Sequence, residues 1–283
     1  MVVVLVTLAA TLCLQLGYFL WKVSADHQPR IGHDPALKVM AALLGDPKWL
    51  AGLAFTVVGW LLFLRATGLG EISLVQPLMS TGDLVLVLLA VVFLGERLGR
   101  REWIGLAVTV LGAVGLAWQA TTVPGTAAAG WRLAVFAAVT LGAAALGATR
   151  LRARDGGELP LALAVGLCFG TGAVLTEAWS SVAPDGWRAA LHPLLLGVVV
   201  ANVAGLVLLQ SAFQRGRAAI VVPVQLAVAN VVAMVGGAWL FAEHLPASRV
   251  VSAGLVVLGA WQLQSGGTPA PAPGAEDRHA DES

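Results

Sequence analysis

Residues 71–94, EISLVQPLMSTGDLVLVLLAVVFL, form a long apolar stretch with one charged side chain near its middle, Asp83. A helix that crosses a bilayer needs about 20 mostly apolar residues, because the hydrocarbon layer is about 30 Å thick and each residue adds about 1.5 Å. A carboxylate at that depth is costly and usually faces the interior of a helix bundle. The stretch therefore predicts a membrane-spanning helix with a polar face turned toward other helices.

The composition of the whole chain supports this interpretation. The 283 residues are 58% hydrophobic and only 12% charged, with a mean hydropathy of +0.83. A soluble domain has about 25% charged residues, so the excess apolar surface must face a lipid bilayer. The net charge of +1 gives no indication of a nucleic-acid partner. Cys13 and Cys168 both lie in apolar runs, so we expect small buried residues rather than a disulfide or a metal pair.

Nine segments are long and apolar enough to span the membrane. They cover residues 1–22, 48–66, 71–94, 102–119, 130–150, 159–180, 191–212, 218–241 and 248–264. The segment from Pro35 to Gly45 has helical spacing but reaches only about 15 Å, so we expect an interfacial or re-entrant helix within residues 24–46. The first span lacks a basic leader and is expected to be retained. Residues 265–283 are predicted to form a disordered cytoplasmic tail.

The positions of lysine and arginine predict the orientation of the spans. When the loops are assigned alternately to two faces, 13 of the 17 basic residues fall on one face and four on the other. The positive-inside rule makes the richer face cytoplasmic, with the N-terminus outside and the C-terminus inside. We expect an integral protein of the bacterial inner (plasma) membrane. Nine of the ten tryptophans lie near predicted span ends, as an interfacial belt requires, and Trp60 is the exception.

An internal repeat relates the second to fourth spans to the seventh to ninth. At an offset of 146, Gly59 aligns with Gly205, Gly70 with Gly216, and Val75-Gln76-Pro77 with Val221-Val222-Pro223; at 147, Glu96 aligns with Glu243, Leu98 with Leu245 and Gly112 with Gly259. The predicted topology gives the two copies opposite directions across the membrane. Inverted repeats are typical of secondary transporters, because equivalent halves can exchange conformations around a central site. The fold prediction is an all-α polytopic membrane protein with about nine transmembrane helices in two inverted repeats, residues 1–120 and 121–264.

The same residues resemble a known transporter unit. Residues 70–78, 93–98 and 103–105 with Gly112 look like the EamA-type unit of the drug/metabolite transporter superfamily, and the second copy matches more weakly at 221–223, 241–245 and Gly259. The resemblance implies ten helices in two inverted sets of five. This chain departs from it by one helix, and we expect the missing helix to be the second of the first set. The layout, with Lys48-Trp49 opening the next helix, is also similar to the nine-helix NIPA-like magnesium transporters.

Polar residues inside the predicted spans are candidates for the substrate or ion pathway. Gln76, Ser80 and Asp83 share one helical face, and Pro77 and Pro223 are predicted to break their helices and free a backbone carbonyl. Asn230 lies one residue from the position equivalent to Asp83, so the two can approach each other across a central cavity. Weaker candidates are Trp60, Asn202, Gln15 and Tyr18; Lys22, on the face of the last two, is expected to extend to the cytoplasmic boundary. Asp83 either binds a proton or cation during transport or is satisfied by neighbouring hydroxyl groups and fixes the packing.

These residues favour a transporter over other classes of membrane protein. The five histidines are scattered, and no Walker or HExxH motif is present, so we expect neither enzymatic activity nor a cofactor. A single intramembrane carboxylate favours a small metabolite or drug-like solute over a divalent cation, which needs several oxygen ligands. Coupling of this transport to a proton is left open. Two alternatives stay open: a NIPA-like magnesium transporter, and a non-transporting membrane assembly protein. A homodimer is a further open alternative.

Overall fold

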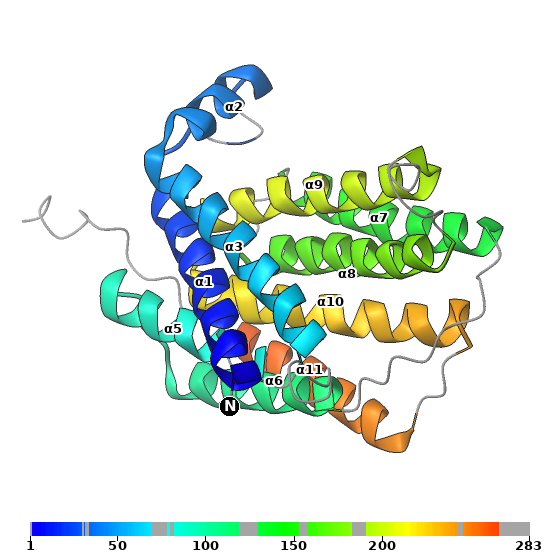
Figure 1. Ribbon diagram of the computed structural model, residues 1–283. Coiled ribbons are helices and arrows are strands. Elements are labelled where there is room, and N and C mark those ends of the chain that lie inside the picture. The colour runs from blue at the N-terminus through cyan, green and yellow to red at the C-terminus, as the bar shows by residue number, and fades with distance from the viewer. Residues whose placement is uncertain are drawn as a thin grey trace, which may run out of the picture.

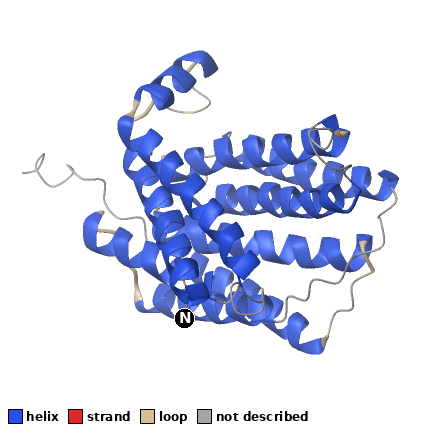
Figure 2. Ribbon diagram, viewed as in Figure 1, coloured by secondary structure: helices blue, strands red, loops and turns tan. Residues whose placement is uncertain are grey.

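The computed structural model describes residues 2–29, 31, 34–69, 78–79, 82–118, 130–152, 158–182, 191–242 and 246–265. Helices account for nearly all of these residues (Figure 2). The helices are α1 (Val2–Ala25), α2 (Ala36–Gly45), α3 (Pro47–Leu69), α5 (Gly82–Phe93), α6 (Arg100–Trp118), α7 (Gly130–Arg152), α8 (Glu158–Val182), α9 (Pro193–Phe213), α10 (Ala218–Leu240) and α11 (Ala247–Ser265). The all-helical class predicted from composition is confirmed for this part of the chain.

Five of the described helices are long and apolar enough to cross a membrane, namely α1, α7, α8, α9 and α10. The pair α2 and α3 would add a sixth span if it is taken as one broken helix, because the two are bent by 77° at their junction. The short helix predicted at residues 35–45 is present as α2. Helix α5 is apolar but short, and residues 70–77 lie outside the described part. The predicted count of nine spans is therefore not confirmed.

The helices pack as two groups that meet at α10. Helices α7, α8, α9 and α10 run side by side, whereas α1 and α3 form a pair that crosses them steeply (Figure 1). Helices α6 and α11 form a second close pair, and α10 contacts α5, α6, α8 and α11. The first eight residues of α10, from Ala218 to Gln225, are all buried. The N-terminal third of α10 is thus the centre of the main core.

Helix α10 continues through Pro223 without interruption, so the predicted break at this proline is wrong. Pro223 is the sixth residue of the helix, where its missing N–H removes only the bond to the carbonyl of Ala219. Lys22, which is expected to extend to the boundary, is only 8% exposed, and its ammonium group is bonded at the end of α9. Gly166 and Gly170 of α8 pack closely on α10.

The contact between α6 and α11 is the same when the two helices are exchanged. A Cβ added at Gly112 would lie 2.7 Å from the backbone nitrogen of Val256, and one added at Gly259 would lie 2.5 Å from that of Thr109. Gly259 follows Gly112 by 147 positions, and Val256 follows Thr109 by the same number. Gly112 and Gly259 are therefore counterparts, and so are the residues that they contact, Val256 and Thr109.

The contact between α1 and α3 likewise has a counterpart between α8 and α9. Gly17 of α1 faces the side chain of Thr56, and Gly172 of α8 faces that of Asn202. Gly172 follows Gly17 by 155 positions, and Asn202 follows Thr56 by 146. The same two offsets relate Gly59–Leu14 to Gly205–Phe169, and Gly82–Thr11 to Val228–Gly166.

Backbone conformation recurs at the same spacing. Among the described residues, positive φ angles occur at Gly95 (66°) and Ala242 (53°), which are 147 positions apart. Such a conformation suits glycine but is unfavourable for alanine, whose Cβ crowds the backbone. Gly95 follows α5 and Ala242 follows α10, so the same left-handed turn comes after both helices.

Candidate functional site

The polar stripe predicted around Asp83 lies largely outside the described residues. Gln76, Pro77 and Ser80 belong to segments that the structure does not describe. Asp83 is the second residue of α5, and its side chain is also outside the described part. The roles assigned to this stripe stay predictions.

Gln15 and Tyr18 lie on the side of α1 that faces the bundle. Gln15 is buried, and its amide nitrogen would lie 3.0 Å from a Cβ added at Gly82, the first residue of α5. Tyr18 is partly buried and meets Trp21 edge-on, with ring centroids 5.8 Å apart. Gln15 therefore lies beside the start of the helix that carries Asp83.

The other three candidates lie on exposed helix surfaces. Trp60 is 56% exposed on α3, and Asn230 is exposed on α10. Asn202 is exposed on α9, where its amide donates a hydrogen bond of 2.8 Å to the carbonyl of Val198, one turn earlier. This amide is satisfied within its own helix.

A groove of about 350 Å³ lies between α8, α10 and α11. Apolar side chains and Trp261 line it, and none of the predicted site residues does. A solute site needs a few converging polar groups to orient its ligand. The groove lacks them and is better suited to lipid than to a polar solute.

Four charged residues meet where α6, α8 and α10 begin, and we call them the clamp cluster: Glu96, Glu102, Glu158 and Arg217. The Arg217 guanidinium donates to Glu102 at 2.8 Å and to Glu158 at 3.0 Å. The backbone N–H of Arg217 also donates to Glu158. Glu102 is 2% exposed, and its second oxygen accepts from the N–H of Gly99, which caps the start of α6. The cluster thus joins α6 to the starts of α8 and α10.

Glu96 caps the N-terminus of α10 from a distant part of the chain. Its two carboxylate oxygens accept from the backbone N–H groups of Ala218 at 2.8 Å and Ala219 at 3.0 Å. These N–H groups have no partner inside the helix, and a carboxylate also matches the positive end of the helix dipole. Glu96, which the sequence marks only through its repeat partner Glu243, thus acts as a helix cap. Burial raises the pKa of the Glu96 carboxyl, and the nearby Glu158 adds to the effect, whereas the two N–H donors and Lys22 lower it.

Lys22 makes the equivalent connection at the end of α9. Its ammonium group donates 2.7 Å hydrogen bonds to the carbonyl of Phe213, the last residue of α9, and to Asp26. A cation is favourable at this negative end of the helix dipole. Lys22 therefore joins α1 to α9, and Glu96 joins the end of α5 to the start of α10, beside Arg217. These residues, which lie on the predicted cytoplasmic side, hold the four helices together at one end.

Sequence reasoning missed Glu102, Glu158 and Arg217, because the arginine is 115 and 59 positions away from its two partners. It also missed Gln210 and Gln225, which are 2% and 0% exposed and whose amide atoms have no hydrogen-bond partner in the part of the chain that the structure describes. The one available signal was a glutamine inside an apolar span. This signal predicts Gln15 and Gln76 as candidates, and it applies equally to Gln210 and Gln225.

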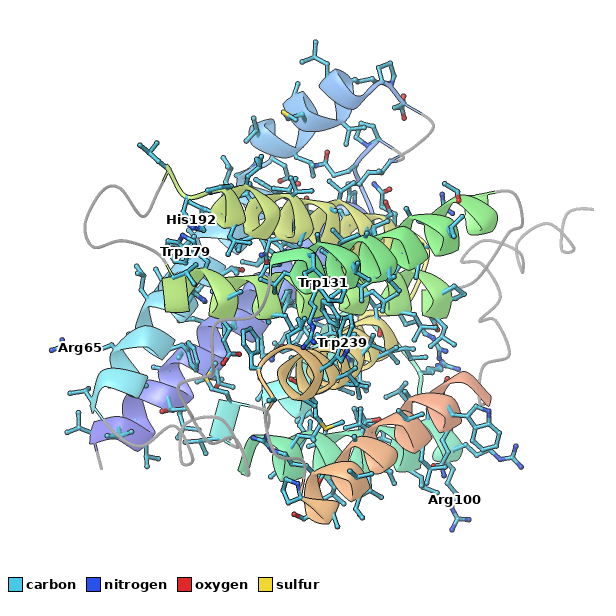
Figure 3. The ribbon with its side chains drawn as sticks, turned by 90° about the vertical axis from the view of Figure 1, so that its right-hand side faces the viewer. Arg65, Arg100, Trp131, Trp179, His192 and Trp239 are labelled. Atoms are coloured by element: carbon cyan, nitrogen blue, oxygen red, sulfur yellow. The ribbon has the colours of Figure 1, made fainter. Side chains whose placement is uncertain are left out.

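Aromatic residues lie at the ends of α7, α8 and α10 that face the viewer in Figure 3. Figure 3 looks onto these ends and shows Trp131, Trp179 and Trp239 with His192, while Arg65 and Arg100 lie at opposite sides of the molecule. Tryptophan at helix ends is typical of a membrane interface. Together with the apolar spans, these features define an integral membrane protein.

Comparisons with known proteins give the class more specifically. Residues 37–118 match the model of the EamA-like transporter family, so this segment is an EamA-like transporter domain. The resemblance found in the sequence is confirmed for this segment.

Two curated relatives are transporters by name. Over 110 residues the chain is 34% identical to the "Probable magnesium transporter NIPA9" of Arabidopsis thaliana, a match that covers 39% of this chain and 31% of the relative. Over 68 residues it is 40% identical to the "Uncharacterized transporter in cobO 3'region" of Sinorhizobium sp, covering 24% of this chain and 48% of the relative. The chain thus spans less than half the length of either relative. No solved structure matches it.

Proposed function

We propose that this protein is a secondary transporter that moves a small solute by alternating access between two inverted four-helix units. The observation that carries the proposal is the recurrence of helix contacts between α1, α3, α5, α6 and α8, α9, α10, α11 at fixed offsets. Inverted units of this kind are the recurrent construction of secondary transporters. The EamA-like domain and the two transporter relatives support the same class.

The recurring contacts pair α1 with α8 and leave α7 without a counterpart. With nine spans, α1 is the first and α8 the sixth, so the two would cross the membrane in opposite directions. A missing second helix, as the sequence suggested, would instead pair α1 with α7, and both would run in the same direction. The contacts therefore favour α7 as the unpaired helix. A single unpaired helix between two units of four helices is what gives the second unit the opposite orientation.

The clamp cluster supports a conformation that is closed at the cytoplasmic end. Glu96 and Glu102 come from the first unit, whereas Glu158 and Arg217 come from the second. The buried start of α10 lies directly beside them. Opening toward the cytoplasm would require these bonds to break, so the cluster is suited to act as a gate between the units.

For the substrate, we favour a small metabolite or drug-like solute, with a proton bound at Asp83 as the coupling ion. Burial of a carboxyl group favours proton binding. Magnesium is the second candidate, supported by the name of the plant relative. A divalent cation needs several oxygen ligands, and among the described residues no three His, Cys, Asp or Glu side chains gather to hold a metal ion. A non-transporting assembly protein is the third, and it would keep the interior dry and closed.

Uptake into proteoliposomes tests the proposal. The reconstituted protein is given Mg²⁺, amino acids and amphipathic cations separately, with and without a pH gradient. We expect uptake of an organic solute that depends on the gradient, and Asp83→Asn should remove that dependence. Uptake of Mg²⁺ alone would favour the second candidate, and no uptake of any probe would refute the transporter.

A further inference from the structure

Gln225 of α10 carries a fully buried carboxamide. It lies on α10 with 0% exposure, and neither its oxygen nor its nitrogen is paired among the described residues. Burying an amide without a partner is unfavourable, and most buried polar side chains are therefore paired. Because this burial lowers the stability of the fold, the presence of a glutamine at this position needs an explanation.

The first unit shows that packing does not require an amide at this position. Gln225 follows Met79 by 146 positions, the offset that also relates Val228 to Gly82. The two side chains have similar lengths, and both positions meet the first helix of their unit. The sulfur of Met79 contacts Thr11 of α1, and Gly166, the counterpart of Thr11, packs against the backbone of Gln225. An unbranched apolar side chain thus fills the equivalent space, and the amide of Gln225 adds polarity rather than volume.

The position of Gln225 along α10 suits contact with a transported solute. It is the last of the eight consecutive buried residues that begin the helix at the clamp cluster. Asn230, about one and a half turns further along, is exposed. Gln225 therefore lies about two helical turns in from the clamp cluster, within the buried start of α10.

We propose that the Gln225 carboxamide binds the transported solute, and that this solute is a small organic molecule with a carboxyl or carboxamide group. The inference rests on the transporter function proposed above. An uncharged amide offers two N–H donors beside one acceptor, which matches a group with an acceptor and a donor side by side. One amide oxygen is a poor substitute for the several hard ligands of a divalent cation.

The test replaces Gln225 by methionine, the residue found at the equivalent position. Wild type and Gln225→Met are reconstituted, and uptake of radiolabelled L-glutamine, L-alanine and nicotinamide is measured beside Mg²⁺ uptake. Thermal unfolding is measured on the same preparations. We expect the variant to unfold at a temperature a few degrees higher, because the unpaired amide is gone, and to take up the organic probe at least ten-fold more slowly. Leu226→Met, a tolerated change on the same helix, should leave both quantities near wild type.

Each other outcome counts against a specific statement. Wild-type uptake by Gln225→Met would overturn the binding role and leave the transporter intact. A lower unfolding temperature with unchanged uptake would show that the amide serves the fold, and so would the loss of folding in both Gln225→Met and Gln225→Leu. Uptake of Mg²⁺ but of no organic probe would overturn the solute class. Absence of all uptake in wild type would refute the proposed function itself.

Discussion

The unit formed by α1, α3, α5 and α6 and the unit formed by α8 to α11 make equivalent helix contacts with different side chains. Where α1 meets α5, the small residue is Gly82 on α5 and the larger one is Thr11 on α1. Where α8 meets α10, the small residue is Gly166 on α8 and the larger one is Val228 on α10. The space needed for close approach is therefore supplied by opposite partners. The close approach of the helices recurs, whereas the residue that permits it does not.

The two units also differ in where they place buried polar groups. Helix α1 buries Thr7, Thr11 and Gln15 on its inner side, whereas the matching side of α8 is built on Gly166 and Gly170. In the second unit the buried amides lie on α9, at Gln210, and on α10, at Gln225. A transporter with inverted units needs similar geometry in both but only one set of substrate contacts, so this division of polar groups agrees with the proposed function.

The largest expected effect comes from filling the contact between α6 and α11. Gly259→Leu would place a side chain against the backbone of Thr109, and Gly112→Leu would do the same against Val256. Backbone atoms cannot yield as a flexible side chain does, so we expect each change to cost about 3 kcal/mol or more. Thermal unfolding in detergent should show two losses of similar size. Gly254→Leu, on α11 with open space around its Cβ position, is the control and should unfold like wild type. Clearly unequal losses at Gly112 and Gly259 would argue against an equivalent contact.

The second largest effect should come from separating the two units at the clamp cluster. Arg217→Met removes the cation that faces Glu102 and Glu158, and Glu102 would stay buried with one oxygen unpaired. Breaking a buried ion pair costs about 3–5 kcal/mol, and we expect about 2–3 kcal/mol here, because the Arg217 side chain is partly exposed. The control Arg132→Met changes an exposed arginine on α7.

If the cluster is a gate, Arg217→Met should also open the cytoplasmic end. Backbone amides at the start of α10 should then exchange hydrogen faster, while those of α7 stay as in wild type. A variant that is less stable but shows unchanged exchange at Ala218 and Ala219 would make the cluster a structural feature only.

The helices and their class could be predicted from the sequence because both depend on local composition. An apolar run long enough to cross a bilayer has few alternatives to a helix, and the observed bounds of α1, α9 and α10 differ from the predicted ones by a few residues. The end of a span is marked by polar and charged residues that border the apolar run. This signal is present in the sequence itself.

The candidate site could be predicted only in part. Gln15 was expected to face the interior and is buried there, whereas Trp60 lies on an exposed surface. A polar residue in an apolar run must face some partner, but the sequence does not say which side of the helix is covered. The clamp cluster depends on contacts between residues more than 50 positions apart, and no spacing rule identifies these. The offset of 155 between α1 and α8 was missed because the matching residues, such as Thr11 and Gly166, are chemically unlike.

A smaller effect is expected at the paired left-handed turns. Ala242→Gly should stabilise the protein by about 1 kcal/mol, because glycine adopts a positive φ without the steric cost of a Cβ. Gly95→Ala should destabilise it by a similar amount for the same reason. Chemical or thermal unfolding of the two variants and of wild type measures both shifts. If Ala242→Gly proved as destabilising as a glycine in a regular helix, the turn after α10 would not have the conformation of the turn after α5.

The smallest effect should be the pH dependence that Glu96 contributes to the first of these turns. Because burial raises the pKa of Glu96 above its ordinary value of 4.5, the folded protein holds this proton more tightly than the unfolded chain does. The resulting stability is fully present at low pH and is lost as the pH rises from 4.5 through the raised pKa. Glu96→Gln cannot titrate, so the unfolding temperature of wild type minus that of the variant should fall across this range and then level off. Glu177→Gln, at an exposed carboxyl on α8, controls for the general loss of a charge. A difference that stays constant or grows with pH would mean that the bonds from Ala218 and Ala219 outweigh the burial, and that the carboxylate form stabilises the contact between the two units.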